Sequence, residues 1–147
     1  MAQGWAAGKK ARKHSDKSGF SFFRFEFEDG GFALYDEWCV NDSSGMSSGT
    51  TTIWFACQVV WFMSYGGYYP KAASRLVKQA LLEAYRARVF TGGRGPTHLV
   101  EGNLEYFNQQ VPGASFEHFS GRERVVDRSE PPSPEIGFHD YMGLALI

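Results

Sequence analysis

The sequence predicts an α+β fold: a curved antiparallel sheet of about six to eight strands, with one amphipathic helix over residues 71–88 packed on it. Two observations lead to this prediction. Aromatic residues make up 16% of the 147 residues and glycine occurs 17 times, a mixture typical of antiparallel strands joined by tight turns. Helical periodicity, by contrast, extends over a single long segment.

The N-terminal segment differs in charge from the rest of the chain, whose overall net charge is -1. Residues 8–17 read GKKARKHSDK, which is strongly basic. Because no aromatic residues alternate with these charges to stack on bases, nucleic acid is an improbable partner. We interpret residues 1–19 as a basic, disordered tail and residues 20–147 as a single domain.

Composition also restricts the compartment and the cofactors. Two cysteines, Cys39 and Cys57, are too few for a disulfide framework or a zinc site. The longest apolar run, residues 59–63, is far too short to cross a bilayer. We therefore expect a cytoplasmic protein with no membrane association, no metal and no cofactor.

Strand patterns dominate the first half of the domain. Residues 20–29 alternate phenylalanine with polar side chains, turn at a glycine pair and continue as a second strand over 32–40, which predicts a hairpin. Residues 41–49 form a polar loop. Strands over 50–55 and 59–65 follow, separated by a short turn.

One segment has the period of a helix. Pro70 suits the first helical turn, where its missing N–H costs nothing. The helix is expected to end near Arg88, before the helix-breaking pair Gly92-Gly93. Its apolar face comprises Ala73, Leu76, Val77, Ala80, Leu81 and Ala84.

After the helix the chain returns to strand patterns. The proline-rich residues 128–135 cannot join a sheet ladder. The strands expected here are 98–107, 115–119 turning at Ser120-Gly121 into 122–127, and 136–147.

Two short motifs resemble sites without completing them. GMSSG, residues 45–49, matches G-x-S-x-G, but the nucleophile elbow needs a strand before Ser47 and a helix after it. A polar loop precedes this serine and a strand pattern follows, so we reject it as a nucleophile. GGRGP, residues 92–96, lacks the Lys-Ser/Thr of a phosphate-binding loop. Arg94 is nevertheless the best polar candidate, because a guanidinium can hold an anion.

The stretch VVWFMSYGGYYP, residues 59–70, contains five aromatic residues in twelve positions. Both faces of 59–65 are apolar, which predicts a central strand covered on both sides. Most of its aromatic side chains are expected to be core, and a ligand is expected beside the turn at 66–70 instead of along the strand. Tryptophan and tyrosine there also suit a cationic ligand.

Six motifs in order resemble the bacterial domain of unknown function 5680 family: VVWFMSYGG, LVKQALLEAY, RGP, EGNLEYF, FSGRERV and HDYMGLALI. The resemblance spans about residues 30–147. The longer RSEPPSPE segment and the HDYMGLALI ending depart from the family pattern. The resemblance implies a small α+β domain, found alone or attached to helix-turn-helix regulators, and it implies no activity or catalytic residue.

The leading interpretation is a non-enzymatic binding or sensing module with an aromatic pocket for a small molecule or a protein partner. Its pocket residues are Trp61, Tyr65, Tyr68 and, as polar anchor, Arg94.

Two alternatives stay open. One is an enzyme of unidentified reaction that uses Glu101, His118 or His139. The other is a structural homodimer joined through its sheet.

Overall fold

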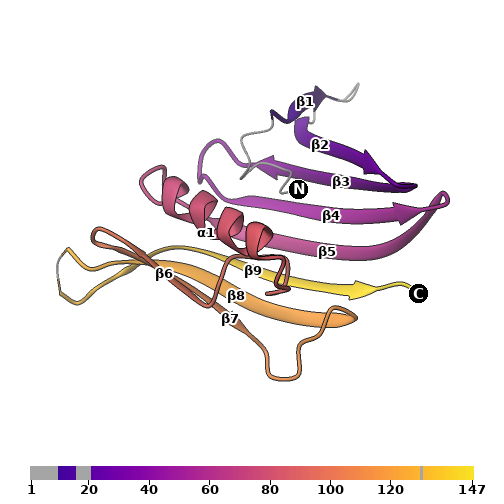
Figure 1. Ribbon diagram of the computed structural model, residues 1–147. Coiled ribbons are helices and arrows are strands. Elements are labelled where there is room, and N and C mark those ends of the chain that lie inside the picture. Colours follow the sequence, from indigo (N-terminus) through magenta and orange to yellow (C-terminus); the bar gives the residue numbers. More distant parts are fainter. Residues whose placement is uncertain (1–9, 16–20, 130) are drawn as a thin grey trace.

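The computed structural model describes residues 10–15, 21–129 and 131–147. These residues form one nine-stranded antiparallel sheet and one helix (Figure 1). The strands are β1 (Arg12–Ser15), β2 (Ser21–Asp29), β3 (Phe32–Val40), β4 (Ser47–Phe55), β5 (Gln58–Tyr68), β6 (His98–Glu101), β7 (Leu104–Gln110), β8 (His118–Asp127) and β9 (Glu135–Ala145).

The strand order is β1-β2-β3-β4-β5-β9-β8-β7-β6. Every neighbouring pair except β5 and β9 is consecutive in sequence, so the sheet consists of two meanders. The first meander runs from β1 to β5 and the second from β6 to β9. Strand β5 therefore lies at the centre of the sheet, and its antiparallel pairing with β9 joins the meanders.

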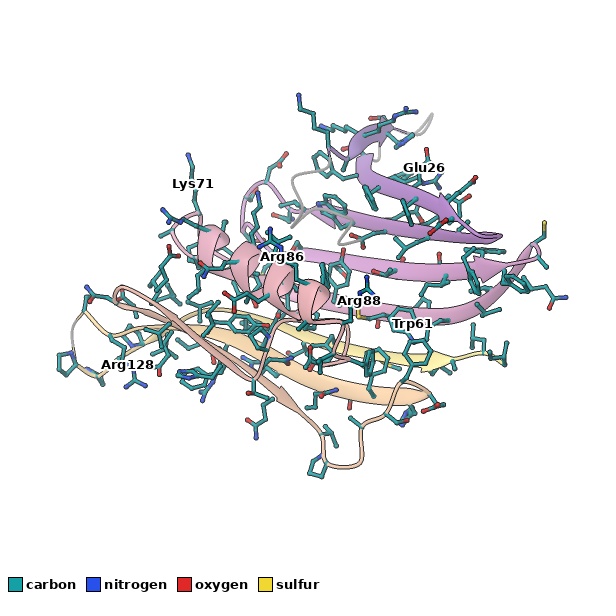
Figure 2. The ribbon with its side chains drawn as sticks, in the orientation of Figure 1. Glu26, Trp61, Lys71, Arg86, Arg88 and Arg128 are labelled. Carbon is teal, nitrogen blue, oxygen red and sulfur yellow. The ribbon has the colours of Figure 1, made fainter. Side chains whose placement is uncertain are left out.

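Helix α1 (Ser74–Ala87) crosses one face of the sheet, which we call the inward face (Figure 1). Arg88 caps the C-terminal end of the helix, and its backbone is left-handed with φ 56°. Lys71, in the turn before the helix, points into solvent (Figure 2). The apolar face expected from sequence is buried: Leu76, Val77, Ala80, Leu81 and Ala84 all face the sheet.

The main core lies between α1 and the second meander. Leu76 and Val77 pack with Tyr106 of β7 and Val125 of β8, and each of these side chains is at most 1% exposed. A second cluster lies where Trp61 and Met63 of β5 meet Phe119 and Tyr141. The helix therefore packs mainly on the β6–β9 side of the sheet.

The α+β class with a mainly antiparallel sheet is confirmed, but the count of six to eight strands is wrong, because the described residues contain nine. The single run expected over 98–107 is two strands, since Gly102 with φ 59° turns the chain between β6 and β7. Conversely, β8 continues straight through Ser120-Gly121, where a turn was expected. The helix also begins at Ser74, three residues after the expected start, because residues 71–73 form a turn.

The N-terminal segment supplies an additional strand. Residues 12–15 form β1, which pairs with β2 at one edge of the sheet. Residues 1–9 and 16–19 of the expected tail lie outside the described residues. Among those described, no helix is long and apolar enough to cross a membrane.

Candidate ligand cavity

A cavity of about 700 Å³ lies between α1 and the inward face of the first meander. Its walls are mostly apolar. The sheet contributes Phe25, Phe27, Leu34, Trp38, Ile53, Trp61 and Met63, and the helix side contributes Val77, Leu81, Tyr85 and Phe90. A cavity of this size and composition is typical of sites for small organic molecules.

Strand alternation and register build this wall. Phe25 of β2 lies opposite Asp36 of β3, Asp36 lies opposite Thr51 of β4, and Thr51 lies opposite Met63 of β5. Because side chains two residues apart share a face, this row and its neighbours all point inward. Gly49 leaves room for the Tyr65 ring, since a Cβ at this position would overlap the ring.

Asp36 is the acidic group of the wall. Its Oδ1 accepts a hydrogen bond from the Tyr65 hydroxyl at 2.9 Å and another from Thr51 Oγ1 at 3.0 Å. Burial raises the pKa of Asp36, and the two hydroxyl donors offset that rise only in part. The carboxyl group is therefore held in place, and its burial makes it costly to ionise.

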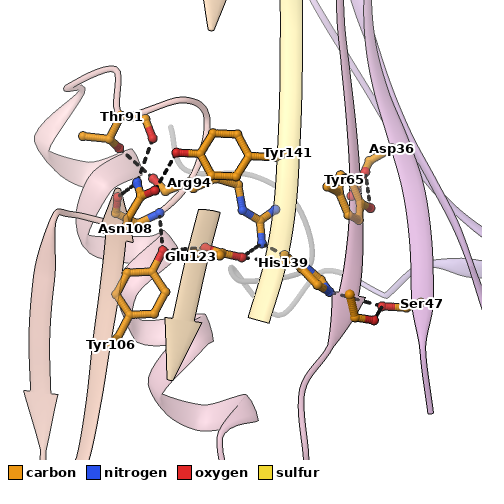
Figure 3. Close-up of polar contacts among 12 residues, drawn as sticks. Asp36, Ser47, Tyr65, Thr91, Arg94, Tyr106, Asn108, Glu123, His139 and Tyr141 are labelled. Atoms are coloured by element: carbon orange, nitrogen blue, oxygen red, sulfur yellow. Dashed lines mark hydrogen bonds and ion pairs between the residues drawn. The ribbon is translucent and has the colours of Figure 1, made fainter. Parts of the chain in front are cut away.

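Arg94 forms a buried ion pair behind the wall, and the pair is shown in Figure 3. Its Nη2 donates to Oε1 of Glu123, whose side chain is 0% exposed. Tyr106 donates to the other carboxylate oxygen at 2.5 Å. Burial alone would raise the pKa of Glu123, but the Arg94 charge and these donors lower it. Glu123 is therefore a carboxylate, and its charge is balanced by Arg94.

The loop after α1 holds Arg94 at this position. Asn108 Nδ2 donates to the carbonyl oxygens of Thr91 at 2.9 Å and Gly95 at 2.7 Å. Tyr141 in turn donates to Asn108 Oδ1 at 2.5 Å. These bonds tie the loop to β7 and β9 and so fix the position of Arg94.

His139 connects the ion pair to the first meander (Figure 3). Its Nδ1 lies 3.4 Å from Arg94 Nη2 and 3.6 Å from Glu123 Oε1, and its Nε2 lies 3.2 Å from Ser47 Oγ. Burial, followed by the Arg94 charge, lowers the pKa of His139 to about 4. The imidazole is therefore neutral at pH 7.

The nearby hydrogen bonds assign the tautomer. Arg94 can only donate, so Nδ1 of His139 accepts from it and Nε2 carries the proton. Nε2–H then donates to Ser47 Oγ, whose own hydroxyl donates to the Gly67 carbonyl at 3.4 Å. In this arrangement His139 does not accept the serine proton.

Two buried polar atoms have no hydrogen bond among the residues described, Tyr69 Oη and Arg94 Nε. Glu123 is still close enough to the Tyr69 hydroxyl for its charge to add to the effect of burial in raising the pKa of that group. Both Tyr69 and Arg94 line the cavity.

The structure places three of the four expected pocket residues at the cavity. Trp61, Tyr65 and Arg94 line it, and the guanidinium carbon of Arg94 lies 5.3 Å from the Tyr65 ring centre. Tyr68 is not among the lining residues, and its ring lies over Gly45. Tyr68 comes three residues after Tyr65 on the same strand, so the two side chains point to opposite faces of the sheet. The cavity also runs along β5 beside Trp61, Met63 and Tyr65. The turn expected to start at Gly66 is wrong, because residues 66–68 continue β5 and pair with β9.

The residues proposed for an enzyme do not meet. Glu101 forms an ion pair with the exposed Arg75. His118 is exposed and lies opposite Leu144, five positions along β8 from Glu123, which lies opposite His139. At about 3.4 Å per residue this separation is about 17 Å. Only His139 is at the cavity. The described residues also contain no group of three or more His, Cys, Asp or Glu arranged to hold a metal ion.

Sequence reasoning missed Asp36, Glu123 and Asn108, and it rejected Ser47. One signal for Glu123 was present: it shares the strand phase of Phe119 and Val125, both buried. A charged residue on the buried face of a strand needs an oppositely charged or hydrogen-bonding partner there; otherwise the strand face has been assigned wrongly. The partner is not visible in the sequence, because Arg94 is 29 residues away.

No family model, curated protein or solved structure matches the chain. The resemblance to the domain of unknown function 5680 family therefore stays a prediction.

Proposed function

We propose that this protein is a non-enzymatic module that binds a small organic molecule in the cavity between α1 and β2–β5. The observation that carries the proposal is the cavity itself, about 700 Å³ in volume, with mostly apolar walls and a few fixed polar groups. Drug-sized ligands occupy cavities of this kind, whereas protein partners need a larger, flatter surface. The exposed free thiols of Cys39 and Cys57 suit a reducing compartment such as the cytoplasm.

The fixed polar groups support binding over a purely structural role. Asp36 is oriented by Tyr65 and Thr51, and Arg94 is oriented by Glu123. A site whose polar groups are already held loses little conformational entropy when a ligand arrives. Tyr65 and Trp61 provide aromatic surface beside these groups.

A cavity-filling variant tests the proposal. N-phenyl-1-naphthylamine, an uncharged apolar dye, is titrated and its fluorescence is recorded. Leu34→Trp places a larger side chain in the cavity, and Ala33→Trp adds the same side chain to the outward face of β3. We expect wild type and Ala33→Trp to bind the dye and Leu34→Trp to bind it at least about tenfold more weakly. Equal binding by Leu34→Trp, or no binding by folded wild type, would overturn the proposal.

A hydrolase is the second candidate, because Ser47 Oγ, His139 and Glu123 lie in the order of a catalytic triad. The tautomer described above disfavours it, as does the 3.6 Å separation of His139 from Glu123. A fluorophosphonate probe decides between the candidates: labelling that disappears in Ser47→Ala favours the hydrolase, and the absence of labelling favours the binding module.

A further inference from the structure

Among the described residues, the carboxyl group of Asp36 has hydrogen-bond partners at only one of its two oxygens. Both hydroxyl donors, from Tyr65 and Thr51, go to Oδ1. Oδ2 has no hydrogen bond with any residue that the structure describes, although Asp36 lines the cavity. A carboxylate oxygen accepts up to two hydrogen bonds, so Oδ2 is an open acceptor at the cavity wall.

The charges around the cavity leave Asp36 without a matching cation. The other ionisable groups in the wall, tyrosines aside, are Arg94 and His139. Arg94 is bonded to Glu123, which balances its charge, and His139 is neutral at pH 7. The neighbouring Glu37 pairs with Arg24 on the outward face. Within the described cavity wall, one negative charge therefore remains to be balanced when Asp36 is ionised.

Aromatic residues neighbour Asp36 on the cavity wall. Phe25 is directly opposite Asp36 on β2, Trp38 is two positions along β3, and the Tyr65 hydroxyl bonds to the carboxyl group itself. All three aromatic residues line the cavity. Phenylalanine, tyrosine and tryptophan faces attract cations, especially where water is excluded.

We infer that the ligand is a hydrophobic amine, whose protonated nitrogen donates to Asp36 Oδ2 and whose apolar body lies against Phe25, Trp38 and Trp61. This inference rests on the proposed function and specifies its ligand class. An ammonium group would provide the missing hydrogen bond, balance the carboxylate charge and contact the aromatic faces together. A carboxylate ligand is the opposite case: it would have to compete with Glu123 for Arg94 and would bring a second negative charge beside Asp36.

Matched ligands test the inference by displacing the dye N-phenyl-1-naphthylamine. The octyl series comprises octylamine, octanoate and octan-1-ol, and the naphthyl series comprises 1-naphthalenemethylamine, 1-naphthoate and 1-methylnaphthalene. In at least one series, we expect half-displacement at an amine concentration about tenfold lower than that of its carboxylate and neutral counterparts, the size of one buried charge-assisted hydrogen bond.

Asp36→Asn identifies the residue responsible. Asparagine keeps an oxygen that can accept from Tyr65 and Thr51 but has no charge, so the variant should fold and still bind the dye. Its amine preference should fall to about one, since the charge-assisted bond is lost. Asp42→Asn makes the same change of charge in the exposed loop before β4 and should keep the wild-type preference.

The outcomes separate the two proposals. Dye binding without any amine preference, or an amine preference that survives in Asp36→Asn, would overturn this inference and leave the binding proposal standing. Tighter displacement by the carboxylates would assign the polar contact to Arg94 and also overturn it. Failure of folded wild type to bind the dye would defeat the proposed function itself.

Discussion

The inward face of the sheet has two halves that differ in how they are covered. On β7–β9, the packed half, Tyr106 and Val125 are fully buried beneath α1. On β2–β4, the open half, Leu34, Trp38 and Ile53 point to the same side but remain partly exposed around the cavity. Strand alternation is the same in both halves. An apolar inward position therefore indicates which way a side chain points, not what it packs against.

The position of α1 explains the difference. Its closest strands are β6 and β7, and the loop that follows it is bonded to β7 through Asn108. Both constraints draw the helix toward the second meander. A single helix cannot cover nine strands, so the half farther from its anchors keeps a cavity.

The largest effect is expected from the buried ion pair beside the packed half. Glu123→Ala leaves the Arg94 charge buried without its partner, and we expect a loss of about 3–5 kcal/mol in the free energy of unfolding. Urea denaturation measures it. Glu37→Ala breaks the half-exposed pair with Arg24 and should cost about 1 kcal/mol or less. The double variant Arg94→Met/Glu123→Leu should be more stable than Glu123→Ala. Similar losses for Glu123→Ala and Glu37→Ala would contradict the burial argument.

Matched leucine truncations test the comparison of the two halves directly. Leu76 is 0% exposed in the packed half, so Leu76→Ala should remove about 2–5 kcal/mol of stability. Leu34 already borders a cavity, and Leu34→Ala should remove about 1 kcal/mol, because fewer contacts are lost. Thermal and urea unfolding of both variants provide the measurement. If Leu34→Ala cost as much as Leu76→Ala, the open half would be packed after all.

His139 lies between the halves and should give stability a pH dependence. Its pKa is lowered from 6.5 to about 4 on folding, so the unfolded chain binds the proton more readily between these values. The histidine contribution to stability is therefore complete above about pH 6.5 and is lost as the pH falls toward 4. The expected loss is on the order of 2–3 kcal/mol.

His139→Gln is the control for this dependence, because glutamine can bond to Ser47 without titrating. The difference in unfolding free energy between wild type and this variant should shrink as the pH is lowered from 7 to 4. A difference that does not change with pH would show that His139 titrates normally in the folded protein.

Local sequence patterns predict much of the fold. The hairpin of β2 and β3, the apolar face of α1 and the central position of β5 all follow from periodicity within a short stretch. The turn expected at Ser120-Gly121 is wrong for a physical reason: Gly121 is needed inside β8 because a Cβ there would overlap the Tyr141 ring of the neighbouring strand. A glycine that makes room for a cross-strand ring looks, in sequence, like a glycine that turns the chain.

The candidate site is less predictable because its parts come from distant strands. Trp61 and Tyr65 are found from their own strand, whereas Asp36 meets Tyr65 across β4, and Ser47 meets His139 across 92 positions of sequence. Such contacts depend on the register between strands, which is fixed by the whole sheet. Residue identity alone cannot indicate them.

The strand order also has a consequence for folding. All neighbouring strands except β5 and β9 follow each other in the chain, so each meander can form from local hairpins. On the ribosome, β5 is complete long before β9 has been made, and until then its backbone edge has no partner strand. Strand β5, which carries Trp61 and Tyr65, therefore keeps an unpaired backbone edge in the nascent chain for the whole time needed to synthesise α1 and β6 to β8.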